Sequence, residues 1–535
     1  METALVSLIC IAMLIVGVVT LTFNAFDAAT SVADSLREME QQASEIRLTE
    51  IDASSWASDI VCAIAYQGGG EDGFVATLGI TTGGEIAGAV TDSLEFDGDN
   101  SYESSIIHVS DNVYAIAYRD SGENGEVRTV EITAAGQITD AAIDSLEFDT
   151  SRGYQPSIVH VSGGIYAIAY TGDGDDGFLK TVEIATDGQI TDTVIDSLEF
   201  DTLNSWEPMI IHVSGDIYAI AYGGDGWNGF LKTVEIATDG QITETVIDTL
   251  VFDTGDCWLE PSIIHVSGDI YAIAYADGDD DGRLKTVEIA TDGQITDTVI
   301  DNLEFDTDRG RTPSMVHASG NLYAIAYRGS GDDGYLKTVE IATDGQITDT
   351  VIDSLEFDTG NTFNPSIVAV SDTVYAIAYL NGGDDGEVRT VEIADSGRIT
   401  GTVVDSLEYD TSGGDTPHII QLYGNFHLAV TNEGQTDLAE FARWDVIVEY
   451  QNSGTDYATY LEYTTDTPPG DNQWMVAGIY LPNGNAEVYD PGILNPEEKM
   501  KLVIVLNPGT ECGTTARITI STPNGVTAQC LVTRY

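Results

Sequence analysis

Residues 156–201 read PSIVHVSGGIYAIAYTGDGDDGFLKTVEIATDGQITDTVIDSLEFD. This stretch contains four runs, 156–162, 164–170, 178–185 and 189–201, in which apolar residues alternate with small or polar ones. Alternation with a period of two is typical of β-strands with one buried face. Asp-Gly pairs separate the later runs, and such pairs favour tight turns between antiparallel strands. The stretch therefore predicts a unit of four antiparallel strands.

The same unit recurs along the chain with a period of about 52 residues. The pentad Tyr-Ala-Ile-Ala-Tyr, or a close relative, begins at Cys62, Tyr114, Tyr166, Tyr218, Tyr271, Tyr323 and Tyr375. A degraded further copy, FHLAV, begins at Phe426. Four-stranded antiparallel units repeated at this period indicate a β-propeller, in which the sheets are arranged as blades around an axis.

Eight copies of the second strand predict an eight-bladed propeller. Because an open ring would expose a sheet edge, we expect residues 46–52 to provide the fourth strand of the last blade. Residues 417–422, 425–430 and 438–443 would provide its other three strands. A seven-bladed ring with the last copy at its periphery is the alternative.

Two sets of loops should emerge on one rim of the propeller, because neighbouring strands run in opposite directions. One set joins the second strand of a unit to the third, and the other joins the fourth strand to the next unit. The second set differs from unit to unit and presents Tyr102, Tyr154, Trp206, Trp258, Arg311 and Phe363 beside acidic loops. These side chains could stack on and hydrogen-bond to sugars or other polar ligands. The alternative is that the loops vary because nothing constrains them.

One rim loop has a spacing of carboxylates that suggests calcium. Residues 277–282 read DGDDDG and place Asp277, Asp279 and Asp281 two residues apart before a glycine. This is the first half of a calcium-loop pattern, which needs oxygen ligands around a turn. The loop lacks the Glu at the twelfth position, so a solvated, Asp-rich hairpin is the alternative. Calcium is the one cofactor that the sequence suggests.

The chain begins with a strongly apolar segment. Residues 4–22, ALVSLICIAMLIVGVVTLT, carry no charge and are long enough to span a bilayer. No basic residue precedes Arg37, so we expect the segment to be retained and not cleaved as a signal peptide. The helical spacing continues without Gly or Pro over 23–45, which predicts a long α-helix over residues 1–45. Its buried positions would be Leu5, Val6, Leu8, Ile9, Ile11, Met13, Leu14, Ile15, Val18, Val19 and Leu21.

Charge and motifs exclude several classes of function. The chain of 535 residues has 89 Asp and Glu against 20 Lys and Arg, a net charge of −69. Such a surface repels nucleic acid, so we expect no nucleic-acid partner. No hydrolase, zinc-protease or phosphate-loop motif is present, and paired carboxylates carry little information in so acidic a chain. We therefore predict that the protein is not an enzyme.

The last part of the chain reads as a second β domain. Residues 444–535 contain six strand-like runs separated by turns rich in Gly, Pro and Asn, which predicts a small β-sandwich. Cys512 and Cys530 lie in this region and form a candidate disulfide outside the cytoplasm. A simple hairpin of 514–521 with 526–533 would not place these two cysteines opposite each other, so the free thiols are the alternative.

The two ends of the chain together resemble archaeal flagellins (archaellins) and, more loosely, type IV pilins. The residues that carry the resemblance are IAMLIV (11–16), LNPEEK (494–499), ARITI (516–520) and TPNG (522–525). The resemblance implies an N-terminal helix bundled in a filament core, an outer β-sandwich and an inserted propeller. Leu5 stands where a type IV pilin usually has Glu, and the family's processing site is missing.

The sequence thus predicts a mainly β protein in three parts: a hydrophobic helix (1–45), a propeller (46–443) and a C-terminal sandwich (444–535). Our main hypothesis is a homopolymeric subunit of an archaeal extracellular filament. Its helices would lie in the membrane before assembly and bury one another afterwards. The propeller would be displayed for adhesion to surface glycans or other cells. The alternative is a monomeric, membrane-anchored adhesin or receptor at the cell surface.

Overall fold

A computed structural model describes residues 46–50, 60–110, 112–133, 135–255, 258–371, 373–422, 426–432, 438–452, 455–464, 473–481, 493–504, 515–523 and 527–533. The predicted helix over 1–45, with all its core positions from Leu5 to Leu21, lies outside these residues. Over the described part of the chain the helical elements are short 3-10 turns, and no helix there is long and apolar enough to cross a membrane.

Each repeat folds into a four-stranded antiparallel sheet, as the sequence predicts. In the unit quoted above these strands are β9 (Tyr154–Ser162), β10 (Ile165–Thr171), β11 (Gly177–Glu183) and β12 (Asp196–Asp201). We call the four strands of a sheet A, B, C and D in this order. The fourth strand is shorter than predicted, because residues 189–195 form a loop, in which an isolated bridge pairs Ile184 with Ile190.

Five further sheets repeat this topology. Their strands are β5 (Tyr102–Ser110), β6 (Val113–Arg119), β7 (Gly125–Glu131) and β8 (Asp144–Asp149); β13 (Ser205–Ser214), β14 (Ile217–Gly224), β15 (Asn228–Glu235) and β16 (Asp248–Asp253); β17 (Trp258–Ser267), β18 (Ile270–Ala276), β19 (Gly282–Glu288) and β20 (Asp301–Asp306); β21 (Arg311–His317), β22 (Leu322–Arg328), β23 (Gly334–Glu340) and β24 (Asp353–Asp358); β25 (Thr362–Ala369), β26 (Val374–Asn381), β27 (Gly386–Glu392) and β28 (Asp405–Asp410).

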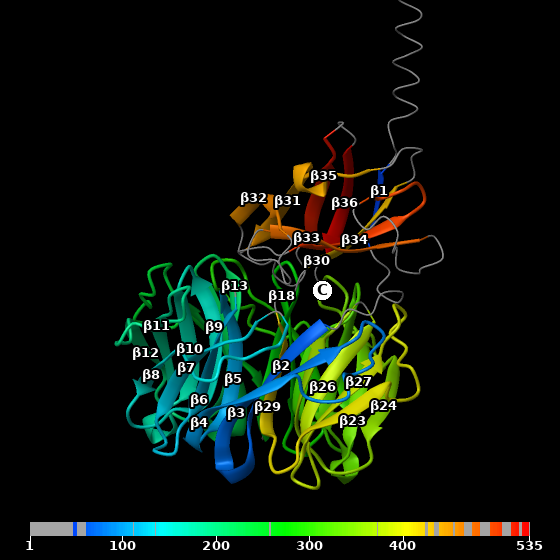
Figure 1. Ribbon diagram of the computed structural model, residues 1–535. Coiled ribbons are helices and arrows are strands. Elements are labelled where there is room, and N and C mark those ends of the chain that lie inside the picture. Colours follow the sequence, from blue (N-terminus) through cyan, green and yellow to red (C-terminus); the bar gives the residue numbers. More distant parts are fainter. Residues whose placement is uncertain are drawn as a thin grey trace, which may run out of the picture.

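The remaining four-stranded sheet combines strands from distant parts of the sequence. Its B, C and D strands are β2 (Ile60–Gln67), β3 (Asp72–Ile80) and β4 (Asp92–Asn100). Its A strand is β29 (Asp415–Gln421), which pairs with β2 so that Cys62 lies opposite Gln421. Each A strand contacts the A strands of its two neighbours, and β29 contacts both β25 and β5. The seven sheets are therefore arranged as in a β-propeller, with the A strands innermost (Figure 1).

The expectation of eight blades is wrong for the described residues, which form seven four-stranded sheets. The first repeat begins with its B strand, so the A strand near residue 417 is needed to complete that sheet. The degraded copy at Phe426 instead forms β30 (Phe426–Asn432), which pairs with β1 (Ile46–Glu50) and β34 (Lys499–Ile504) of the C-terminal sheet. Residues 46–50 therefore do not supply the D strand of a blade.

The sheets nest because each B strand has a large face and a small face. Tyr166, Ile168 and Tyr170 pack toward the preceding sheet, whose Ala115 and Ala117 belong to the same core cluster. The small face of the same strand, Ala167 and Ala169, packs against the Tyr and Ile residues of β14. These side chains are buried in every complete repeat, and the pattern confirms the alternation seen in the sequence.

Two belts of hydrogen bonds join each sheet to the next. In the first, a buried C-strand threonine donates to a glycine carbonyl in the C–D turn of the following sheet at 2.5 to 2.6 Å, as Thr181 does to Gly240. In the second, the Asp that begins each D strand accepts the backbone N–H of an isoleucine in that turn at 2.8 to 3.0 Å. Each belt has seven bonds and returns from the β25–β28 sheet to the β2–β4 sheet, through Thr390 to Gly84 and Ile86 to Asp405.

A third contact between sheets lies where the D strands end. Asp149 Oδ2 accepts hydrogen bonds from the Tyr170 hydroxyl at 2.6 Å and from Lys180 Nζ at 2.7 Å, and both donors belong to the next sheet. Burial alone would raise the pKa of Asp149, but these donors and the backbone N–H of Ser151 outweigh it, so the pKa lies below its usual value. Equivalent Asp, Tyr and Lys or Arg groups occur at five further junctions.

The glycine that ends each B–C loop is required for close packing and not for turn conformation. Gly177 begins β11, and a Cβ atom on it would lie 2.4 Å from Cε2 of Phe200. The positive φ angles of this loop belong to Gly174 and Asp175 instead. The expectation that the Asp-Gly pairs form the B–C hairpins is therefore wrong, whereas in the C–D turns Gly188 does have φ near 83°.

Replacing Gly177 with Ala should destabilise the fold, because the methyl group would overlap the buried Phe200 ring. We expect a loss of about 1–3 kcal/mol in the free energy of unfolding, measured by urea denaturation. Gly401→Ala is the matched control, since a Cβ atom there meets nothing within 4 Å. Equal losses in the two variants would contradict this account.

The C-terminal β domain consists of two antiparallel halves. One contains β1, β30, β34 and β33 (Gln473–Tyr480), and the other contains β32 (Thr455–Tyr463), β31 (Asp445–Asn452), β35 (Thr515–Ser521) and β36 (Thr527–Thr533). A two-residue parallel pairing between β32 and β33 joins them. Leu461, Trp474 and Ile518 share one buried core across both halves. Cys530 lies in β36 opposite Ile518, whereas Cys512 lies outside the described residues, so the predicted disulfide stays a prediction.

Side chains at one position of the A strands accept a hydrogen bond from a backbone N–H of the next A strand. In five sheets this side chain is a serine, and in β29 it is His418, whose Nδ1 accepts the backbone N–H of Ile106 at 3.0 Å. An imidazole that accepts through Nδ1 must be neutral. Burial lowers the pKa of His418 to about 4.

The free energy of unfolding should therefore fall as the pH is lowered from about 6.5 toward 4, because only the unfolded chain takes up this proton. His418→Ser, which restores the residue of other repeats, should remove this dependence. Because His418 keeps some solvent contact, we expect wild type to lose up to about 2 kcal/mol more than the variant between pH 7.5 and 4.5. Parallel urea-denaturation curves at the two pH values would not support this assignment.

Candidate functional site

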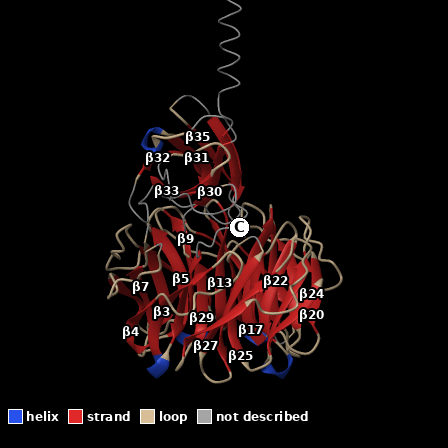
Figure 2. Ribbon diagram, turned by 45° about the vertical axis from the view of Figure 1, so that its right-hand side comes forward, coloured by secondary structure: helices blue, strands red, loops and turns tan. Residues whose placement is uncertain are grey.

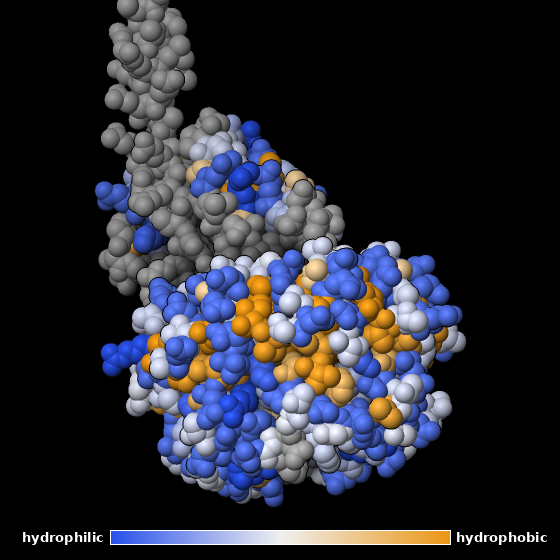
Figure 3. Space-filling view, turned by 180° about the vertical axis from the view of Figure 1, so that it is seen from behind, coloured by the Kyte–Doolittle hydropathy of each residue, from blue (hydrophilic) through white to orange (hydrophobic). Residues whose placement is uncertain are grey.

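The B–C and D–A loops emerge together at one end of the propeller, as predicted. Backbone hydrogen bonds connect the two sets, for example from Gly153 N to Glu123 O at 2.9 Å and from Gly310 N to Asp280 O at 2.7 Å. The 3-10 turns of the B–C loops, drawn blue in Figure 2, mark this end of the molecule, and the C-terminal β domain lies at the other end. We call the loop-bearing end the rim. On the side drawn in Figure 3 the propeller is mostly hydrophilic at the rim, and its apolar side chains gather nearer the C-terminal domain.

At the apex of each B–C loop lies one residue, other than glycine, whose backbone has a positive φ angle. We call this residue the apex residue; the seven are Glu71, Glu123, Asp175, Trp227, Asp280, Asp332 and Asp384. The turns η2 (Gly69–Glu71), η3 (Asp173–Asp175), η4 (Asp225–Trp227) and η5 (Ser330–Asp332) end on apex residues. Left-handed backbone conformation is uncommon for residues other than Gly, Asn and Asp. Trp227 is the one apex residue without a carboxylate.

Tyr102 and Tyr154 are not open platforms, because arginine side chains cover them. The guanidinium of Arg119 lies 4.1 Å from the ring centre of Tyr102 and 4.2 Å from that of Tyr154. Arg152 lies 4.3 Å from the Tyr154 ring and pairs with the apex residue Asp175 at 2.5 Å. Rings and guanidinium groups thus alternate along this part of the rim.

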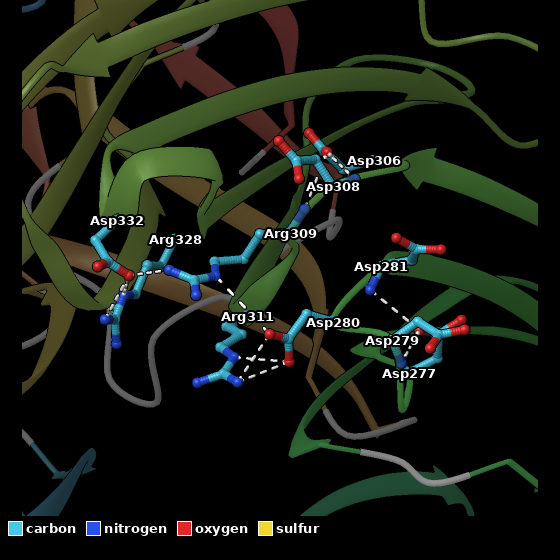
Figure 4. Close-up of polar contacts among 10 residues, drawn as sticks. All are labelled: Asp277, Asp279, Asp280, Asp281, Asp306, Asp308, Arg309, Arg311, Arg328 and Asp332. Carbon is cyan, nitrogen blue, oxygen red and sulfur yellow. Dashed lines mark hydrogen bonds and ion pairs between the residues drawn. The ribbon is translucent and has the colours of Figure 1, made fainter.

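Arg311 and Phe363 are also held by neighbouring side chains. Arg311 forms a bidentate pair with the apex residue Asp280, with N–O distances of 2.7 to 2.9 Å (Figure 4). Arg328 lies 4.4 Å from the ring centre of Phe363 and also pairs with the apex residue Asp332, as does Arg309. Of the predicted rim residues, Tyr102, Tyr154, Arg311 and Phe363 therefore all belong to clusters of aromatic, basic and acidic groups.

The proposed calcium ligands do not converge on one point. Asp277 accepts the backbone N–H groups of Asp279 and Asp281 through Oδ1 (Figure 4). Its Oδ2 accepts a hydrogen bond from Arg283 at 2.6 Å. Asp281 also faces Arg283, at 3.5 Å. Across the described residues no group of three or more His, Cys, Asp or Glu side chains could hold a metal ion. The arrangement instead matches the alternative of an Asp-rich hairpin, closed by an arginine.

Trp206 has a different neighbour from the other rim residues. Its ring stacks on that of Trp227, with centres 4.8 Å apart and an angle of 16° between the planes. Trp227 is 46 % exposed, and Leu203, in the loop that leads to Trp206, is 55 % exposed. Trp258 begins β17 opposite Ala276, and its side chain lies outside the described part of the structure.

A second set of polar residues lies near the start of six of the seven A strands, one residue after the predicted rim position or its equivalent. Glu103, Gln155, Glu207, Thr312, Asn364 and Thr416 all have positive φ. The backbone N–H of Gln155 donates to Glu103 Oε2 at 2.7 Å, and Gln155 Nε2 donates to Glu207 Oε1 at 3.0 Å. Burial raises the pKa of Glu103, although Arg119 opposes this shift. Sequence reasoning missed this set, although five of its six members directly follow a residue that it did select, and Thr416 is the exception.

The Arg119 stack should contribute measurably to stability. Arg119→Met would remove the cation from between the two tyrosine rings, and we expect a loss of about 1 kcal/mol in the free energy of unfolding. Arg119→Lys is the matched control and should lose less, because it keeps the charge. A Met variant as stable as wild type in urea denaturation would show that the stack is energetically neutral.

Comparison with known proteins gives similarity of fold only. No family model matches the chain, and no curated protein matches it. A "hypothetical selenium-binding protein" from Sulfolobus tokodaii has a TM-score of 0.50 and 9% identity, covering 68% of this chain and 93% of its own. A "putative 6-phosphogluconolactonase" from Bacteroides uniformis has a TM-score of 0.51 and 9% identity, covering 68% of this chain and 100% of its own. The archaellum stator complex FlaF and FlaG from Sulfolobus acidocaldarius aligns over 21% of this chain at 20% identity, covering 78% of its own, but its TM-score of 0.15 establishes no shared fold.

The resemblance to archaellins and type IV pilins is wrong as a family assignment. The similar structures are β-propeller-like, and the described residues contain no α-helix. Local structure accounts for the C-terminal motifs that suggested the family. The backbone N–H of Asn495 donates to Glu498 in a turn before β34, and Ile518 and Ile520 are the buried positions of β35. An alternating β-strand after a turn is too common to identify a family.

Proposed function

We propose that this protein is a non-enzymatic binding protein of the cell surface, which holds its propeller so that the rim faces a partner. One observation supports this proposal above the others. β1, which follows the apolar segment 4–22 closely in sequence, belongs to the C-terminal β domain, at the end of the propeller opposite the rim (Figure 1). An anchor attached at that end would leave the rim pointing away from the membrane.

The distribution of sequence variation supports the same function. The strands and C–D turns are nearly identical from repeat to repeat, whereas the D–A loops on the rim differ. Identical units could build the ring without any rim variation, so the differences suit a surface that meets a particular partner. We also infer that the seven sheets form a closed ring, because both belts of hydrogen bonds return to the β2–β4 sheet.

Anchoring by residues 4–22 and assembly of many copies through the helix over residues 1–45 are both predictions from the sequence. The proposal needs only the first, because a single anchored copy would present the same rim. The predicted partners of the rim are surface glycans or other cells. The chemistry of the rim side chains determines which of these it binds.

Surface display can be tested with a cysteine placed on the rim. Asp384→Cys introduces a thiol at an exposed apex residue, and we expect a membrane-impermeant maleimide to label it on intact cells. The parent chain, whose Cys62 is buried, is the control for labelling at other cysteines. Labelling only after lysis would contradict display on the surface.

Anchoring can be tested in the same cells. A double substitution, Leu8→Asp with Ile15→Asp, should move the protein from the membrane fraction to the soluble fraction, because two charges in the apolar segment oppose insertion. Recovery of the unsubstituted chain as detergent-resistant filaments would favour self-assembly over a monomeric anchor. Recovery of the unsubstituted chain in the soluble fraction would exclude both the membrane anchor and the filament.

A further inference from the structure

The outer edge of each propeller sheet is its D strand, because the order of strands in each sheet ends there. An edge strand presents N–H and C=O groups that can pair with a strand of another molecule, and charged side chains on the edge oppose such pairing. Six of the seven D strands carry an exposed glutamate as their fourth residue. These are Glu95, Glu147, Glu199, Glu304, Glu356 and Glu408.

The D strand β16 is the exception, because its fourth residue is Val251, which is 41 % exposed. Val251 lies opposite Phe230 of β15. In the preceding sheet, Glu199 of β12 lies opposite Phe178 of β11 in the same way. Each of these phenylalanines stacks on a tyrosine of its own B strand. The two edges therefore have matching surroundings and differ in whether the exposed residue is charged.

The backbone of β16 offers hydrogen-bonding groups at the same edge. The N–H of Thr249 donates to Oδ1 of Asp248 at 2.8 Å, so it points away from β15. Residues along an antiparallel strand point their N–H and C=O groups alternately to its two sides. Those of Val251, two residues further on, therefore also point outward. In the described part of the chain no strand pairs with this side of β16.

We propose that two copies of this protein associate through β16, with the two strands antiparallel about a twofold axis at Val251. In this register Val251 of one copy lies opposite Val251 of the other, and Leu250 lies opposite Phe252. Thr249 lies opposite Asp253, so no two carboxylates stand opposite each other. The same pairing of any other D strand would place two glutamates face to face, and like charges directly opposite destabilise a sheet.

A second copy suits this edge because the strand needs no opposite charge from its partner. The aspartates at its two ends already have partners in their own chain. Asp253 pairs with Lys285 at 2.6 Å, and Asp248 accepts the backbone N–H of Ile295 at 2.9 Å. A strand with an apolar centre and neutralised ends is complementary to itself, as a twofold contact requires. This inference goes beyond the proposed function and does not depend on it.

Sedimentation equilibrium of the full-length chain in detergent micelles tests the association. One strand edge buries less than the about 1,200 Å² of a stable interface, so we expect reversible dimers at about 10 to 100 µM protein. The association constant should rise at least about fivefold between about 0.1 and 1 M NaCl, because salt screens the repulsion between two copies of charge −69. The apolar segment 4–22 is the same in all variants below, so differences between them report on the sheet edges.

Val251→Glu is the decisive variant, because glutamate occupies this position in the other six sheets and should fold here. We expect at least about tenfold weaker association, since two carboxylates would stand opposite each other, with an unchanged melting temperature. Val251→Thr is the matched uncharged control and should keep most of the association. Glu199→Val makes the reciprocal change at the matching edge of β12, and it should produce oligomers larger than dimers.

The register can be tested with Val251→Cys. Opposite Cα atoms in a hydrogen-bonded antiparallel pair lie about 5.5 Å apart, which is within the range of a disulfide. Mild oxidation should therefore link two copies at this position. Glu199→Cys is the control for a D strand that does not pair, and the parent chain accounts for links through the native cysteines.

Several outcomes would overturn the inference. Equal association of wild type and Val251→Glu would place the contact elsewhere, and a wild-type chain that stays monomeric over the whole concentration range would exclude it. If Val251→Cys cross-links to a different protein on intact cells and forms no homodimer, the edge belongs to a strand of that protein. None of these results bears on the rim, whose surface display is decided separately by maleimide labelling.

Discussion

The architecture depends on side chains of one sheet that bond the backbone of the next. A threonine and an aspartate in each repeat bind the following C–D turn, and these contacts run through all seven sheets. The apolar packing between the sheets is not directional, whereas these hydrogen bonds are. Because the donors and acceptors are fixed in sequence position, each copy of the unit specifies its angle to its neighbour, and nearly identical repeats suffice.

The same requirement accounts for part of the unusual composition. Each sheet uses one aspartate at the start of its D strand and another near its end, and at six junctions the second receives a Tyr hydroxyl and a Lys or Arg from the next sheet. Several of the few basic residues of the chain are therefore structural, and most of the others described pair with acidic groups on the rim. The acidity is a property of the surface in general, but these particular carboxylates hold sheets and loops together.

Local patterns in the sequence predicted the four-stranded units well, whereas the pairing of strands far apart in the sequence was predicted poorly. The alternation in Tyr166–Tyr170 and the rim position of Trp206 followed from periodicity and strand direction alone. The fate of Phe426 did not, because its apolar pattern fits either a blade or the C-terminal sheet. Pairing of β29 with β2 decided between them, and that pairing joins residues more than three hundred positions apart. The arginines that cover Tyr102 and Tyr154 were also beyond local reasoning, since Arg119 approaches the first from the adjacent strand and the second from another sheet.

The way in which the chain enters and leaves the propeller has a mechanical consequence. β1 leads to β2, and β29 leads to β30, while β1 and β30 pair with each other in the C-terminal domain. Both connections therefore reach the propeller at two adjacent strands of one sheet. A pulling force between a bound partner on the rim and the C-terminal domain would pass along the chain through that sheet, and it would load the hydrogen bonds that join β2 to β3 along the strands. Resistance to detachment under flow would thus depend on this one sheet more than on the other six.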